Sequence, residues 1–184
     1  MASANHFCYM LLQLLLFIFL VNIHPCSSFD PQTEQRVQKI CRQIEDFGFC
    51  YQTFTQNIKS QSADFVLMTL IALDQTTKNA TNAHNIVVRL LSTVTDQSTK
   101  NALIACENAY NVVTLSFQDA SADFNRGDYD SMLKSEDIAP RAQASCEISF
   151  VTPPSPADPL KEINRQMRIL VAMAMVSGHE LLGY

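Results

Sequence analysis

The cysteines are the residues of this sequence that could take part in the largest number of different chemical roles. Cys41 and Cys50 form a C-x8-C pair, and Cys106 and Cys146 lie further along the chain. Such cysteines can clip helices together through disulfides, supply part of a metal site, or have no joint role. Zinc sites and redox motifs use shorter spacings than these. Structural disulfides are therefore the interpretation that we favour.

Side chains suited to catalysis are sparse. His84 and His179 both fall in segments with helical periodicity, and neither has a second ligand at metal-binding spacing. The adjacent carboxylates in 45–46 and 136–137 diverge along the backbone, so we expect Glu45, Asp46, Glu136 and Asp137 to be solvated or to favour a first helical turn. Neither a phosphate-binding glycine loop nor a GxSxG motif occurs in the sequence. We predict a protein that is not an enzyme and that needs no metal or cofactor.

The beginning of the chain has the composition of a secretory leader. The first 28 residues contain no Lys, Arg, Asp or Glu, and residues 10–21 form an apolar run broken only by Gln13. This run has the length of a signal-peptide core and is shorter than a membrane span. Cys26 and Ser28 are small residues at the positions expected before a signal-peptidase cut. We predict a signal peptide at 1–28, with an uncleaved signal anchor as the alternative.

Cleavage after Ser28 changes what the composition implies. Four of the six cysteines remain, and an even number in an oxidising compartment favours two disulfides, for which four cysteines allow three pairings. The net charge of −5 argues against a nucleic-acid-binding protein, which would gather basic residues on one surface. The length of 29–184 suits a single domain with a core of its own.

Helical periodicity dominates the chain after residue 60. Apolar residues recur at steps of three and four in two segments, which is the pattern of helices with one buried stripe. The first stripe contains Leu103, Cys106, Tyr110, Val113, Phe117, Ala120 and Phe124, and the second contains Leu160, Ile163, Met167, Leu170, Ala174, Ser177 and Leu181. Gly127 suits the left-handed position after the first helix, and the prolines in 153–159 make a stiff connector before the second.

Two further segments complete the set. Residues 63–98 contain two apolar stretches in phase around a polar middle, and they predict one long helix capped by Ser62, with two shorter helices as the alternative. Residues 129–150 predict a broken helix that Pro140 reopens. The polar middle of 63–98 includes an N-glycosylation sequon at Asn79.

These segments predict an all-α fold, with an antiparallel four-helix bundle at 61–184 and an N-terminal α-hairpin extension at 29–60. Cys106 and Cys146 lie on the apolar faces of neighbouring helices, so they are placed to pair across the seam. Gly48 precedes Cys50 in a Phe-Gly-Phe sequence, and we expect it to form the bend that brings Cys41 and Cys50 together.

With these elements in place, the chain resembles the plant invertase and pectin methylesterase inhibitors over essentially the whole of 29–184. An ordered set of features carries the resemblance: a secretory leader, the C-x8-C pair, CENAYNVV at Cys106, ADFNRGDY, Cys146 followed by Phe150, and an amphipathic C-terminal helix with Ile163 and Asn164. The resemblance implies a four-helix bundle behind an α-hairpin, with disulfides Cys41–Cys50 and Cys106–Cys146. It also implies a secreted inhibitor that binds an enzyme one-to-one over its active-site cleft.

The enzyme that such an inhibitor would bind depends on one turn. In the invertase-directed branch, Pro-Lys-Phe follows the Gly-Asp pair, whereas Tyr129, Asp130 and Ser131 follow Gly127 and Asp128 in this chain. An acidic residue thus replaces a basic residue that is aimed at an acidic pocket, and the resemblance therefore favours pectin methylesterase. A cell-wall or vacuolar acid invertase is the alternative partner, and a non-inhibitory secreted binding or allergen-like relative is the alternative function.

The five residues Gly127 to Ser131 are the candidate partner-binding residues, and a turn that only connects two helices is the alternative interpretation. We expect the protein to be monomeric when free and to lie in the apoplast and cell wall, with the vacuole as the alternative location. Once the leader is removed, we expect no membrane and no nucleic-acid partner.

Overall fold

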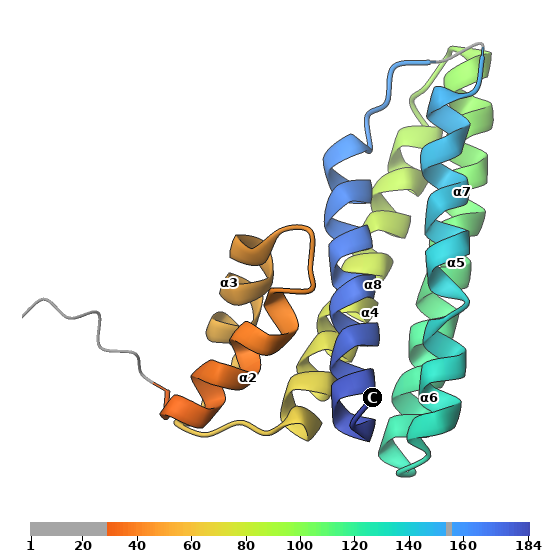
Figure 1. The fold of residues 1–184 in the computed structure, drawn as a ribbon. Helices are drawn as coiled ribbons and strands as arrows, with labels where there is room; N and C mark the ends of the chain where they lie inside the picture. The colour runs from red at the N-terminus through yellow and green to blue at the C-terminus, as the bar shows by residue number, and fades with distance from the viewer. Residues whose placement is uncertain (1–28, 154–155) are drawn as a thin grey trace, which may run out of the picture.

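The computed structural model describes residues 29–153 and 156–184, so the expected signal peptide lies outside the described residues. All regular secondary structure in the described part is helical: α2 (Pro31–Cys41), α3 (Phe47–Asn57), α4 (Phe65–Leu91), α5 (Gln97–Asn125), α6 (Tyr129–Glu136), α7 (Ala139–Val151) and α8 (Lys161–Leu182). Helices α4, α5 and α8 form a bundle with α6 and α7, which follow one another as its fourth member, and α2 and α3 lie beside it as a hairpin (Figure 1). The predicted all-α fold is confirmed.

Aspartate residues cap helices α2 to α6. Asp30, Asp46, Asp64, Asp96 and Asp128 each accept a hydrogen bond from the backbone N–H three residues further on. Each bond satisfies one of the N–H groups that a helix start leaves without a partner. The prediction that Ser62 caps the long helix is wrong, because the Asp64 carboxylate takes this place, with Oδ1 2.9 Å from the backbone nitrogen of Leu67.

Helix α4 runs without a break through the polar middle that the sequence left ambiguous. Thr76 and Ala80 are fully buried there, so one face of the polar stretch still belongs to the core. The Thr76 hydroxyl lies 2.7 Å from the Ala72 carbonyl oxygen and 3.1 Å from that of Leu170 in α8. The single long helix is confirmed, but it ends at Leu91 rather than at 98, because Asp96 begins the next helix.

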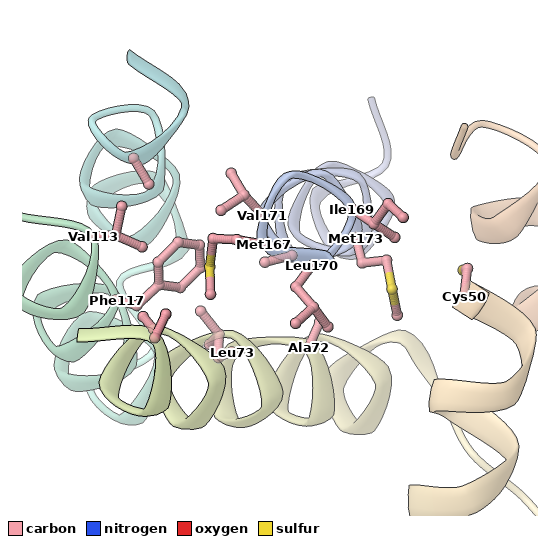
Figure 2. Close-up of a cluster of buried hydrophobic side chains, with 14 of the residues drawn as sticks. Cys50, Ala72, Leu73, Val113, Phe117, Met167, Ile169, Leu170, Val171 and Met173 are labelled. Atoms are coloured by element: carbon pink, nitrogen blue, oxygen red, sulfur yellow. The ribbon is translucent and has the colours of Figure 1, made fainter. Parts of the chain in front are cut away.

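The core is built from the predicted stripes. All seven residues of the first stripe, from Leu103 to Phe124, are buried on α5. Figure 2 shows Phe117 of α5, Leu73 of α4 and Met167 of α8 converging between the helices, and all three are buried. Burial of side chains of this size stabilises the fold by about 1.5–3 kcal/mol each.

Helix α8 also packs on the hairpin. Ile169 and Met173 are fully buried and point away from Val171, towards the side where Cys50 of α3 lies (Figure 2). Two arginines of α8 reach the connection between α2 and α3. Arg165 pairs with Asp46 and Arg168 pairs with Glu45, each with a nitrogen–oxygen distance of 2.9 Å.

The hairpin bends before Gly48. Cys41 is the last residue of α2, Cys50 lies in the first turn of α3, and the disulfide between them joins Cα atoms 5.5 Å apart. The bend lies between the two helices at 42–46, so the prediction that Gly48 forms it is wrong. Residues 47–49 are already helical because Asp46 caps α3 by accepting a hydrogen bond from the Phe49 N–H at 2.9 Å.

The second disulfide joins Cys106 of α5 to Cys146 of α7 across 40 positions of sequence, with Cα atoms 4.4 Å apart. We expect replacement of both cysteines by alanine to lower the free energy of unfolding by about 4 kcal/mol, because the bond restricts a long loop of the unfolded chain. The same replacement at Cys41 and Cys50 should cost somewhat under about 3 kcal/mol, because that loop is shorter. Urea unfolding followed by circular dichroism measures both values, and a larger loss at Cys41 and Cys50 would contradict this expectation.

Candidate partner-binding surface

The candidate residues Gly127 to Ser131 form the corner between α5 and α6, at one end of the bundle (Figure 1). Gly127 has a φ of 73°, the left-handed conformation expected after a helix end. Asp128 then caps α6 by accepting a hydrogen bond from the Ser131 N–H at 3.1 Å. Gly127 and Asp128 therefore lie in the turn itself, and Tyr129, Asp130 and Ser131 form the first residues of α6.

Contacts from the interior fix this corner in place. The rings of Phe124 and Tyr129 pack with centroids 5.6 Å apart. Asp123 is buried, pairs with Arg126, and accepts a hydrogen bond from the Ser135 hydroxyl at 3.1 Å. Its carbonyl oxygen also accepts a bond of 3.0 Å from the N–H of Asp128. The corner is thus held by both α5 and α6, which reduces the ordering that partner binding would require.

The exposed groups of the corner are mainly acidic. Hydrogen bonds from the side chain and then the backbone of Ser131 hold the pKa of Asp128 below its usual value, and Arg126 and Lys134 lower this pKa further. Asp130 is exposed in the first turn of α6, where the helix dipole favours a negative charge. The corner therefore presents two carboxylates with cationic side chains on either side.

An exposed aliphatic row on α5 was not among the sequence-based candidates. Ile104, Val112 and Leu115 are 43%, 39% and 52% exposed. Asn108 and Asn111 lie between them and are also exposed. Aliphatic side chains that share an outward helix face with neutral amides suit a contact with another protein. The sequence could have indicated this exposed row, because its aliphatic residues lie off the buried stripe of α5.

A buried carboxyl group lies at the end of α6 that is remote from the corner. Glu136 of α6 is fully buried, and neither of its carboxylate oxygens has a hydrogen-bond partner among the described residues. The expectation that Glu136 is solvated is wrong, because α6 packs against Gly178 of α8. A β-carbon at Gly178 would lie 3.5 Å from Glu136 Oε2 and only 2.7 Å from the tip of Leu133. Burial raises the pKa of Glu136 to about 8.

We expect Glu136 to make folding stability depend on pH. Its pKa rises from 4.5 to about 8 on folding, so the folded protein keeps a proton that the unfolded chain releases. Stability is therefore complete below the lower pKa, and it falls by about 1.4 kcal/mol per pH unit as the pH rises towards the higher one. Glu136→Gln should remove this fall, as measured by urea unfolding across the interval. Asp137→Asn is the matched control, because Asp137 is exposed. The same decline in Glu136→Gln as in the wild type would refute the assignment.

The other side chains considered in the sequence lie elsewhere. The His179 ring packs against Tyr184 with centroids 5.9 Å apart, and His84 is half-buried in α4. Asn79 lies within α4, where its side-chain amide donates to the Gln75 carbonyl oxygen at 2.8 Å.

Among the described residues, no group of three His, Cys, Asp or Glu side chains could hold a metal ion. None of the helices in this part of the chain has the length and apolarity to cross a bilayer.

These features define a disulfide-clipped four-helix bundle with a helical hairpin at its side. A family model described as plant invertase/pectin methylesterase inhibitor matches residues 35–176. The chain belongs to this family. The resemblance stated from the order of the motifs is therefore confirmed, and membership of a family of inhibitors agrees with the expectation that the chain is not an enzyme.

Solved structures share the fold. A mutant form of a pectin methylesterase inhibitor from Arabidopsis is similar with a TM-score of 0.69 and 17% identity, over 78% of this chain and 95% of that one. A pectin methylesterase inhibitor from Arabidopsis thaliana is similar with a TM-score of 0.61 and 18% identity, over 80% of this chain and 96% of that one. Identities at this level relate the folds alone. A comparison with curated proteins found no match.

Proposed function

We propose that this protein is secreted to the cell wall and inhibits pectin methylesterase by binding one-to-one over the enzyme's active-site cleft. Family membership supports an inhibitor of either a pectin methylesterase or an invertase. The acidic corner is the observation that favours pectin methylesterase over invertase. Asp130 is exposed at the position where the invertase-directed sequences resembled here have a lysine.

The charge of Asp130 suits the two enzyme classes differently. Glycoside hydrolases such as invertase use a pair of Asp or Glu residues, so a second carboxylate entering that pocket would meet like charges. A pectin methylesterase removes methyl esters and leaves carboxylates on its substrate. Its cleft therefore has to accommodate anionic groups, which favours contact with Asp128 and Asp130.

The corner and the aliphatic row can serve as two parts of one contact surface. The row lies on α5, and the corner consists of the turn that ends α5 and the first residues of α6. Leu115 precedes Gly127 by about 18 Å of helix. The row of Ile104, Val112 and Leu115 supplies apolar area that gains free energy when water is excluded. The carboxylates of the corner supply charge recognition at one end of that area.

Separate titration of the two enzymes tests the target. At mildly acidic pH, we expect the purified protein to inhibit pectin methylesterase with one-to-one stoichiometry and to leave acid invertase active. Inhibition of invertase alone would move the assignment to that enzyme. Activity of both enzymes at micromolar protein would favour the non-inhibitory relative and would end the inhibitor proposal.

A charge reversal tests the corner. We expect Asp130→Lys to weaken inhibition of pectin methylesterase about tenfold, which corresponds to about 1.4 kcal/mol of lost charge complementarity. Asp74→Lys is the matched control, because Asp74 is exposed on α4 and pairs there with Lys78 at 2.7 Å. Inhibition constants and circular dichroism are measured for both variants. Equal inhibition by the wild type and a folded Asp130→Lys variant would reduce the corner to a connection between two helices.

A further inference from the structure

A groove with basic walls lies on the hairpin, where α2 passes the start of α4. It is lined by Gln32, Gln35, Arg36, Gln38, Lys39, Arg42 and Phe65. Three of these side chains are cationic, three are neutral amides, and none is acidic. A chain with a net charge of −5 thus gathers positive charge at this place.

The two inner cations of the groove are fixed by the fold. Arg36 and Lys39 lie 6.0 and 5.7 Å from the centroid of the Phe65 ring. Arg36 also donates to the Ala63 carbonyl oxygen at 2.9 Å, and Lys39 pairs with Glu180 of α8 while its side chain stays 58% exposed. These contacts anchor both side chains, and each cation keeps donors that are free to meet a ligand.

The third cation, Arg42, has no carboxylate partner among the described residues. Its guanidinium donates to the Gln38 side-chain oxygen at 3.0 Å, and the side chain is exposed. The one acidic residue within α2, Glu34, is engaged by the Tyr51 hydroxyl at 3.0 Å and the Gln38 amide at 2.7 Å. Arg36, Lys39 and Arg42 therefore form a row about 9 Å long in which positive charge is only partly compensated.

The composition of the groove restricts the class of ligand that it can bind. Duplex nucleic acid needs a broader basic surface than one groove on an acidic chain. An anionic membrane would be met by protruding apolar side chains beside the cations, whereas Phe65 is half-buried beneath them. A single row of cations and amides along one helix matches a linear chain that carries both carboxylates and hydroxyls, because arginine pairs with carboxylates and amides bond hydroxyls.

We propose that this groove binds a linear polysaccharide with free carboxylates, of the kind that removal of methyl esters from pectin produces. The choice of a polyuronate rests on the proposed function, whereas the anion site rests on the groove itself. Binding there would hold the inhibitor on the polymer where the target enzyme works. The groove lies on the hairpin and the corner lies on α5 and α6, so the two surfaces can act separately.

Calorimetric titration tests the groove. The probes are an unesterified oligogalacturonate and its methyl ester of equal length, at low ionic strength and mildly acidic pH. The variant is Arg42→Gln, because the Arg42 side chain is exposed and its guanidinium donates to Gln38 of α2. The matched control is Arg89→Gln, which removes the same charge from an exposed position on α4. We expect the wild type and Arg89→Gln to bind the unesterified chain alike, and Arg42→Gln to bind it about tenfold more weakly, since one charge-assisted hydrogen bond is lost.

Several results would overturn the groove assignment: equal affinity of Arg42→Gln and Arg89→Gln, equal binding of the methyl ester, or tighter binding of anionic phospholipid vesicles or duplex DNA. Inhibition of pectin methylesterase on a small soluble ester is measured in parallel, and Arg42→Gln should leave it unchanged. If oligogalacturonate binds but inhibition is absent, the proposed function fails and the groove assignment stands. If inhibition is present but oligogalacturonate does not bind, the groove assignment alone fails.

Discussion

The burial of helix α8 on two opposite sides governs the arrangement of the other elements. Leu170 and Met167 fill the bundle, while Ile169 and Met173 face the hairpin (Figure 2). A helix with one apolar stripe would need partners on one side only. Because α8 has a second apolar side, the hairpin of α2 and α3 packs there as part of the same core, and the surfaces on the hairpin and on the bundle share one framework.

The acidic corner depends on the same helix. Gly178 of α8 admits α6 so closely that a β-carbon would approach the side chain of Met132 to 2.9 Å. This approach positions α6 and hence Asp128 and Asp130 at its start, but it also buries Glu136, whose carboxylate has no hydrogen-bond partner in the part of the chain that the structure describes. A buried carboxyl is tolerated best when it is protonated, so the fold is suited to the mildly acidic setting that the proposed function requires.

Sequence periodicity predicted the elements whose burial is decided locally. The stripe from Leu103 to Phe124 is buried because a continuous helix fixes which residues share a face, and Cys106 lies opposite Cys146 for the same reason. Sequence periodicity could not predict the burial of Glu136, because the space for this carboxyl group is left by Gly178, which is remote in sequence. The place of the hairpin bend was also wrong, since Asp46 begins α3 before Gly48 and a glycine alone does not show where a helix starts.

The orientation of the basic groove relative to the corner is set by two kinds of interaction with different roles. The ion pairs of Arg165 and Arg168 with the α2–α3 connection are partly exposed, and such pairs contribute about 0–1 kcal/mol each. Burial of Ile169 and Met173 supplies several times that amount, so apolar contact attaches the hairpin to α8. Apolar contact alone would let the hairpin slide along α8. Arg168 pairs both with Glu45 of the α2–α3 connection and with Glu147 of α7, the latter at 2.5 Å, and this bridge fixes the position of the hairpin along the bundle. The groove therefore keeps a fixed direction relative to the corner, as the proposed binding of a polymer and an enzyme at the same time requires.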